Sequence, residues 1–391
     1  MTLTINRDYL INTLTDLVRI NSVNPSLVED GRGEAEIGRY IAGELRALGL
    51  AVTIHESKPQ RPSIVGILKG KGRGRSLMLN GHMDTVGVPG MPNPFTPTIR
   101  DGKLSGRGAY DMKGSLTACL TAAEALVASG KTLNGDLLIA AVADEEYASL
   151  STAEVIKHYK ADGAVVTEPT EMSICLAHKG FVWLEVETIG RAAHGSRFAD
   201  GIDANMRMGR FLAELDQLEQ ELRQGSGHPL TGPPSLHAAI ITGGTALSAY
   251  ADRCRLKIER RTLVGESEAQ VVSEIQDILN RLATADPTFQ GTVKAFLTRE
   301  PSEISPESSI VRTLSQASTE VLGLRPAHIG IPYWMDTALL SAAGIETVAM
   351  GPIGAGAHAR VEWVDIQSLI DLAEILVHTT LNYCQYFAAG H

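Results

Sequence analysis

Short apolar runs alternate with longer helical patterns along the first half of the chain. The apolar runs lie at 51–54, 63–68, 76–79, 137–142 and 164–166, and the helical patterns lie at 34–49, 113–128 and 151–159. Strands that alternate with helices favour an α/β sheet whose centre is largely parallel. The sequence therefore predicts an α/β fold, in which sites form beyond the carboxyl ends of the strands.

The pattern changes near residue 180. Residues 181–188 alternate apolar and polar side chains, which is the period of a half-exposed strand. Further elements are predicted at about 203–223, 236–242, 254–262, 266–284 and 291–297, before helices at 307–322 and 364–382. We therefore expect a larger domain of residues 1–179 and 295–391. A small α+β domain with an antiparallel sheet, residues 180–294, is inserted into it.

Composition and charge exclude several classes of protein. The 391 residues include 35 basic and 45 acidic side chains, a formal net charge of −10. This charge argues against a nucleic-acid partner, which needs clustered Lys and Arg. No apolar run approaches the ~20 residues that span a bilayer. The four cysteines form no CxxC pair, and the first residues lack a signal-peptide pattern. We expect a cytoplasmic protein with reduced cysteines.

Two motifs in the N-terminal half carry candidate site residues. His82 and Asp84 stand two residues apart directly after a predicted strand, and a nearby carboxylate can orient a metal-binding imidazole. A hydrogen-bonded loop histidine is the alternative. Asp111 stands between glycines and just before a predicted helix. It is either a helix N-cap or a carboxylate that bridges two metal ions, and one role does not exclude the other.

Carboxylates also follow the next two predicted strands. Asp144, Glu145 and Glu146 come directly after the apolar run 137–142, and Glu168 follows the run 164–166. Crowded like charges are costly unless a cation or solvent compensates them, and a solvated loop is the alternative. Of two adjacent glutamates, one can bind metal while the other holds a proton.

A glycine-rich loop near the C-terminus, residues 351–362, presents His358. It lacks the GxGxxG spacing of a phosphate-binding loop. Taken together, the motifs supply two histidines and several carboxylates, nearly all placed after predicted strands. Nitrogen and oxygen ligands without sulfur suit a catalytic Zn²⁺, Co²⁺ or Mn²⁺.

The ordered motifs GHMDT, GRGAYDMKG, DEE, TEPT, AAHGS and GAHARVE resemble one family across nearly the whole chain. It is the aminoacylase, acetylornithine deacetylase, succinyl-diaminopimelate desuccinylase and glutamate carboxypeptidase family of dinuclear zinc hydrolases. The resemblance implies a zinc-exopeptidase-like catalytic domain with a mixed, largely parallel sheet. It also implies that the inserted domain is a lid and a dimerisation surface.

The resemblance also implies a role for each motif residue. One of two divalent metal ions, most simply Zn²⁺, would be bound by His82 and Glu168. The other would be bound by His358 and Glu146, with Asp111 bridging the two. Glu145 would be the general base, and Asp84 the partner of His82.

In the lid, His194 would stabilise the oxyanion, often from the partner subunit. Asn205 and Arg261 would hold the substrate carboxylate or backbone. Whether Arg260 or Arg261 points inward depends on the strand register. Tyr333 and Trp334 would line the acyl pocket or belong to a core.

These inferences predict a metal-dependent hydrolase that cleaves the amide bond of an N-acyl amino acid or a related small molecule. Glu168 favours deacylation, because peptidases of the family often have Asp at that position. The alternative enzyme is a dipeptidase or carboxypeptidase on the same scaffold. A ligand-binding homologue without catalysis is the rival from another class, although such a protein would not need Glu145. A homodimer through the lid is expected, along an exposed edge of the sheet that includes residues 181–188.

Overall fold

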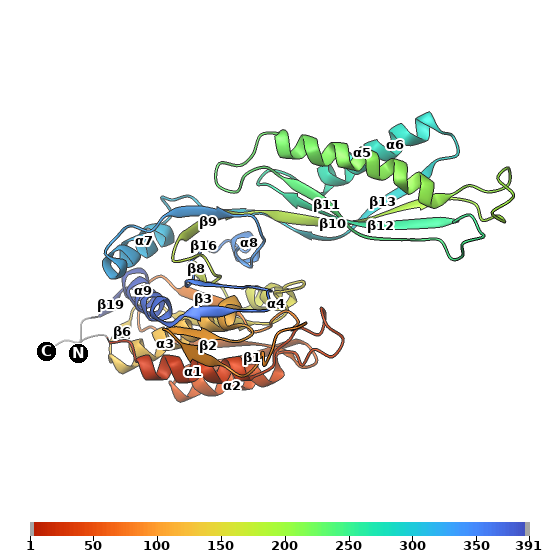
Figure 1. Cartoon of the computed structure of the whole chain (residues 1–391). Helices are drawn as coiled ribbons and strands as arrows, with labels where there is room; N and C mark the ends of the chain where they lie inside the picture. The colour runs from red at the N-terminus through yellow and green to blue at the C-terminus, as the bar shows by residue number, and fades with distance from the viewer. Residues whose placement is uncertain (1–3, 388–391) are drawn as a thin grey trace. The chain divides into compact units, whose positions relative to one another are not determined.

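The computed structural model describes residues 4–387. The chain divides into two compact units (Figure 1). Unit 1 comprises the residues up to Leu176, together with Ile304–Ile329 and those from Met335 onward. Unit 2 comprises Ala177–Glu303 and Gly330–Trp334. Within the described part of the chain, no helix is both long and apolar enough to span a membrane.

Unit 1 is built on a mixed sheet. Its strand order is β1 (Ala51–Lys58), β2 (Arg61–Leu68), β7 (Leu137–Val142), β3 (Leu77–His82), β8 (Gly163–Val166), β16 (Glu346–Ala349), β9 (Ile174–His178) and β14 (Ser302–Glu303). β15 (His328–Ile331) also pairs with β9. The pairs β7–β3, β3–β8 and β8–β16 are parallel, whereas β1–β2, β2–β7 and β16–β9 are antiparallel. The predicted α/β fold with a parallel centre is thus confirmed.

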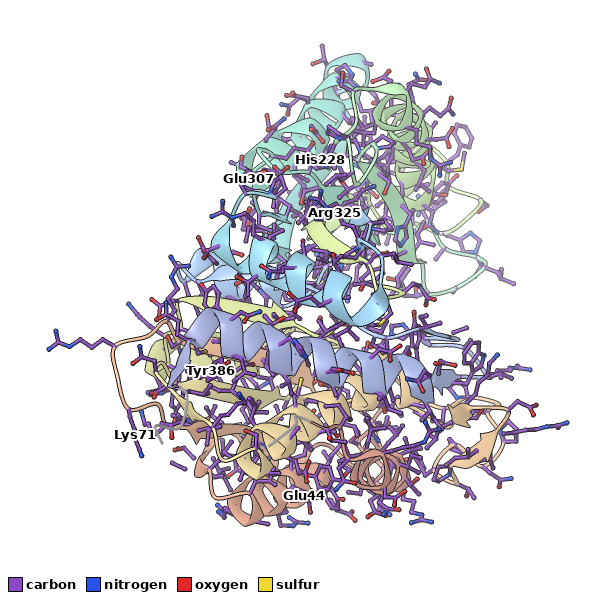
Figure 2. The ribbon with its side chains drawn as sticks, turned by 90° about the vertical axis from the view of Figure 1, so that its left-hand side faces the viewer. Glu44, Lys71, His228, Glu307, Arg325 and Tyr386 are labelled. Carbon is purple, nitrogen blue, oxygen red and sulfur yellow. The ribbon has the colours of Figure 1, made fainter. Side chains whose placement is uncertain are left out.

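Helices cover both faces of this sheet. The main core lies under α2 (Ala35–Ala47), α3 (Gly114–Ala128), α7 (Ser309–Leu322) and α9 (Ile366–Cys384). Figure 2 looks onto α7 and α9, which lie side by side. From each strand every second residue enters this core, for example Leu77 and Leu79 of β3. The opposite face is covered by α4 (Leu150–His158) and α8 (Thr337–Ala342).

Smaller elements complete unit 1. The N-terminal helix α1 (Arg7–Arg19), which the sequence analysis did not predict, packs on α3. A short sheet joins β4 (Thr98–Arg100), β5 (Lys103–Ser105), β18 (Trp363–Asp365) and β17 (Gly354–Ala355). This sheet brings segments near Asp111 and His358 together, although more than 200 residues separate them in sequence.

Unit 2 is an antiparallel sheet with helices on one face. Its strand order is β11 (Ser235–Gly243), β12 (Arg253–Thr262), β10 (Gly180–Ile189) and β13 (Gln290–Arg299). The helices α5 (Ala204–Gln224) and α6 (Glu268–Ala285) cover Val182, Leu184 and Val186 of β10. β13 continues past residue 294, where the sequence analysis placed the end of the inserted domain. β10 is an inner strand, so the free edges of the sheet are β11 and β13.

Candidate dinuclear metal centre

Four neighbouring parallel strands of unit 1, β7, β3, β8 and β16, lead to polar residues at one edge of the sheet. β3 ends at His82, and β7 runs into Asp144, Glu145 and Glu146. β8 leads to Glu168, and β16 leads to the loop that carries His358. Because parallel strands share one carboxyl edge, these residues converge as the sequence predicts.

Asp111 lies between the two histidines. It belongs to an irregular turn, Ala109–Lys113, just before α3. Its Oδ1 is 3.1 Å from Nε2 of His82, and its Oδ2 is 3.3 Å from Nε2 of His358. Each carboxylate oxygen therefore faces a different imidazole, which is the arrangement of a carboxylate able to bridge two cations.

Two glutamates flank this central group. Oε1 of Glu168 is 3.7 Å from Nε2 of His82, and Oε2 of Glu146 is 3.0 Å from Nε2 of His358. The ligand atoms of His82, Glu145 and Glu168 lie within 4.8 Å of one another, as do those of His82, Asp111 and Glu146. Glu145 and Glu146 are thus adjacent in sequence but belong to different groups.

Burial and crowding perturb the pKa values of these groups. Burial, followed by the charge of Glu168, raises the pKa of Glu145 well above its usual range. Burial raises the pKa of Glu168 to about 8 and that of Glu146 to about 6. Hydrogen bonds that His358 donates to the Asp111 and Glu146 carboxylates raise the pKa of His358 to about 10. The carboxylates are therefore costly as anions unless positive charge lies among them.

The donor set meets the needs of divalent cations. Two imidazole nitrogens and several carboxylate oxygens converge without any thiolate, which suits Zn²⁺, Co²⁺ or Mn²⁺. Oε1 of Glu146 is buried and has no hydrogen-bond partner among the described residues. A buried oxygen of this kind is costly unless a ligand satisfies it. These residues are therefore candidate ligands for a metal pair.

Asp84 contacts His82 through its backbone. Nδ1 of His82 is 2.8 Å from the carbonyl oxygen of Asp84, whereas the Asp84 carboxylate is 3.8 Å away. The carboxylate instead accepts hydrogen bonds from the backbone N–H groups of Glu145 and Glu146, each at 3.2 Å. Asp84 therefore contacts both the histidine and the glutamate loop.

Sequence reasoning assigned no role to Glu362, although it noted the surrounding loop. This buried carboxylate accepts hydrogen bonds from the backbone N–H groups of Gly108, Tyr110 and Asp111, at 2.9 to 3.1 Å. It also pairs with Arg107 at 2.6 Å, and Arg107 donates to the carbonyl of Ala359. Glu362 thus ties the Asp111 turn to the His358 loop.

The remaining predicted site residues lie in unit 2. His194 is exposed, and its Nδ1 is 2.8 Å from Oγ of Ser196. Arg260 is buried and paired with Glu266 and Glu274. Arg261 lies on the uncovered face of the sheet, where it pairs with Glu259.

Asn205 is the second residue of α5, and its side chain lies against Gly243. A Cβ atom on Gly243 would come within 2.1 Å of the Asn205 Oδ1, so a larger residue at 243 would displace the Asn205 side chain. Tyr333 and Trp334 belong to unit 2. Trp334 packs edge-on against the rings of His178 and Phe181, and Tyr333 is exposed.

Comparisons with known proteins identify the family. Residues 78–382 match peptidase family M20/M25/M40, and the chain belongs to this family. An N-formyl-4-amino-5-aminomethyl-2-methylpyrimidine deformylase of Bacillus subtilis (strain 168) is 30% identical over 385 residues, which cover 90% of each chain. Acetylornithine deacetylase of Myxococcus xanthus is 26% identical over 386 residues, covering 95% of this chain and 97% of the relative.

Solved structures share the fold. A tripeptidase from Staphylococcus aureus aligns with a TM-score of 0.81 at 20% identity, covering 97% of this chain and 99% of that one. The YXEP protein of Bacillus subtilis, a dinuclear metal-binding peptidase of the M20 family, aligns with a TM-score of 0.73 at 15% identity, covering 97% and 99%. The family and its relatives make this chain a metal-dependent hydrolase of amide bonds.

Proposed function

We propose that the chain removes a small acyl group from the nitrogen of an amino acid or a related amine. The observation that carries this proposal is the position of the Asp111 carboxylate, whose two oxygens face His82 and His358. Two divalent ions, most simply Zn²⁺, would be held by His82 and Glu168 and by His358 and Glu146, with Asp111 shared. The deformylase and the deacetylase among the relatives both act on acylated nitrogen, which supports deacylation.

Glu145 is the proposed general base. When bound, the metal pair polarises the amide carbonyl and acidifies a water molecule. The Glu145 carboxylate takes the proton of the attacking water and passes it to the leaving amine nitrogen. The backbone N–H of Glu145 donates a hydrogen bond to the Asp84 carboxylate, which fixes the backbone position from which the Glu145 side chain extends. The ligand atoms of Glu145, His82 and Glu168 lie together, which supports a role at the reacting centre.

Unit 2 is the proposed lid and dimerisation domain, with residues 180–294 as its inserted core. His194 donates from Nε2 to the oxyanion, and the contact of its Nδ1 with Ser196 supports this use of Nε2. Asn205 and Arg261 hold the substrate carboxylate, and the uncovered position of Arg261 supports this assignment. The four cysteines are buried thiols, which supports a cytoplasmic location.

A substrate screen tests this function. The metal-depleted protein is reconstituted with Zn²⁺, Co²⁺ or Mn²⁺ and given N-formyl and N-acetyl amino acids, N-formyl aminopyrimidines and dipeptides. We expect a kcat/KM for at least one N-acyl compound that exceeds every dipeptide value by more than tenfold. A preference for dipeptides would replace deacylation with the peptidase alternative.

A further inference from the structure

A network of buried polar side chains lies directly behind the glutamate loop of unit 1. It draws Asn24 and Glu34 from the N-terminal segment, Arg61 from the start of β2, and Asp84 and Asp144 from the loops after β3 and β7. All five residues are less than a tenth exposed. Asn24, Glu34 and Arg61 precede the segment that matches the family, residues 78–382.

Arg61 lies at the centre of this network. Its Nη2 donates to Asp144 at 2.9 Å, to Glu34 at 2.7 Å and to the side-chain oxygen of Asn24 at 3.1 Å. A second nitrogen of Arg61, Nε, also pairs with Glu34. A planar guanidinium with several donors can hold these oxygens in one fixed geometry.

Asn24 connects Arg61 to Asp84. Its amide nitrogen donates to the Asp84 carboxylate at 2.8 Å and to Asp144 at 3.3 Å. The same Asp84 carboxylate accepts the backbone N–H groups of Glu145 and Glu146. A continuous chain of hydrogen bonds therefore runs from Arg61 through Asn24 and Asp84 to the backbone of Glu145.

Asp144 needs this support because of its backbone. Its φ is +66°, a left-handed conformation that is uncommon for residues other than glycine. Such conformations persist where the surroundings over-determine them, and they cluster at functional sites. Arg61 and Asn24 both bind the Asp144 side chain, and Glu34 accepts its backbone N–H at 3.3 Å. The residue before Glu145 is thereby held from several sides.

We propose that Asn24 and Arg61 are positioning residues that fix Glu145 for proton transfer. This inference rests on the proposed role of Glu145 as the general base. Neither residue needs to touch the substrate, because both act through Asp84 and Asp144. Misplacing a catalytic group by about 1 Å can lower the rate by about 10²-fold. The network therefore affects turnover more than substrate binding or metal content.

A double-mutant cycle tests the proposal. Asn24→Ala should lower kcat by about 10- to 100-fold at saturating metal. KM should stay within threefold, and the number of bound metal ions should not change. In the Glu145→Gln background the same substitution should change the residual kcat by less than threefold, because the group that it positions is already gone. Asn21→Ala is the matched control. Asn21 belongs to the same segment, and its side-chain oxygen accepts the N–H of Val23, two residues away, so its loss should leave kcat within twofold.

Other outcomes are equally decisive. An equal loss of kcat in the wild-type and Glu145→Gln backgrounds would show that Asn24 acts elsewhere, and would overturn the proposal. Full turnover by Glu145→Gln alone would instead overturn the proposed function. If Asn24→Ala does not fold, Arg61→Lys is used in the same cycle, because it retains the charge but loses the forked geometry. Hydrogen exchange of residues 143–149 in the metal-free protein should be faster in either variant.

Discussion

At the scale of single residues, Glu145 and Glu146 show how geometry separates chemically identical groups. Glu146 reaches Nε2 of His358 at 3.0 Å, whereas the ligand atoms of Glu145 lie beside those of His82 and Glu168. Both backbone N–H groups are held by the same carboxylate, that of Asp84. Successive side chains then leave the chain in different directions, which allows one to bind metal and the other to move a proton.

Substitution of each glutamate should therefore have a different result. Glu145→Gln should keep both metal ions and lose kcat by at least ~10²–10⁴-fold, the usual contribution of a general acid–base. Glu146→Gln should weaken one metal site and regain part of its activity at high metal concentration. Metal analysis and steady-state kinetics measure both effects. If Glu145→Gln loses metal while Glu146→Gln keeps it, the two assignments are reversed.

His194 provides a second test at this scale. His194→Ala should leave the metal content unchanged and lower kcat by about 10²–10³-fold, since an oxyanion donor acts mainly in the transition state. Ser196→Ala is a useful companion, because it removes only the partner of Nδ1. We expect that variant to lose much less activity. Unchanged kcat in His194→Ala would exclude the oxyanion role.

At the scale of elements, the sequence was sufficient to locate those strands that are continuous apolar runs. β7 was predicted at its observed bounds, and Glu168 follows β8 as predicted. β3 continues past the predicted run 76–79 and ends at His82 itself. The short strand β16 and the helix α1 were missed, because neither has so clear a pattern. The sequence analysis had no signal for the partners of Glu362 either, because Arg107 lies 255 residues away.

The end of β9 provides a prediction about stability. His178 is buried, and burial lowers its pKa to about 4. An unfolded histidine has a pKa of about 6.5, so the unfolded chain binds this proton first as the pH falls. The contribution of the neutral His178 to the free energy of unfolding is therefore complete above pH 6.5. It is lost between about pH 6.5 and 4, with a total near 3 kcal/mol.

The variant His178→Gln isolates this effect. Glutamine does not titrate, so the free energy of unfolding should fall less between pH 7 and 5 than in the wild type. Denaturant unfolding of both proteins without metal measures the difference, since the other acidic groups contribute equally to each. Identical pH dependence in the two proteins would show that His178 is not buried in its neutral form.

At the scale of the whole molecule, metal binding and folding should be linked. The cluster around Asp111 brings several buried carboxylates together, and two cations would neutralise much of their repulsion. Anything that binds only the folded chain stabilises it, by about 4 kcal/mol at a thousandfold excess over Kd. Chelation should therefore lower the melting temperature and abolish activity, and Zn²⁺ or Co²⁺ should restore both. Elemental analysis should find two ions per chain. Saturation at one ion with full activity would contradict the dinuclear site.

The last prediction concerns the proposed dimer. Of the two free edges of the unit 2 sheet, β11 is the more open, since its residues from His237 to Gly243 are all exposed. Ile240 and Ile241 on this strand are more than half exposed. An uncovered, apolar edge strand is a template for pairing with another chain. We therefore expect two copies to pair along β11.

A charge on this edge should break the pairing. Ile241→Lys should shift the protein from dimer to monomer at micromolar concentration, as measured by light scattering. Phe296→Lys is the matched control, because Phe296 is similarly exposed but lies on the opposite edge strand, β13. That variant should remain a dimer. If His194 acts across the dimer, the Ile241→Lys monomer should also lose kcat while keeping its metal. A wild-type protein that is monomeric and fully active would contradict both the dimer and the action of His194 from the partner subunit.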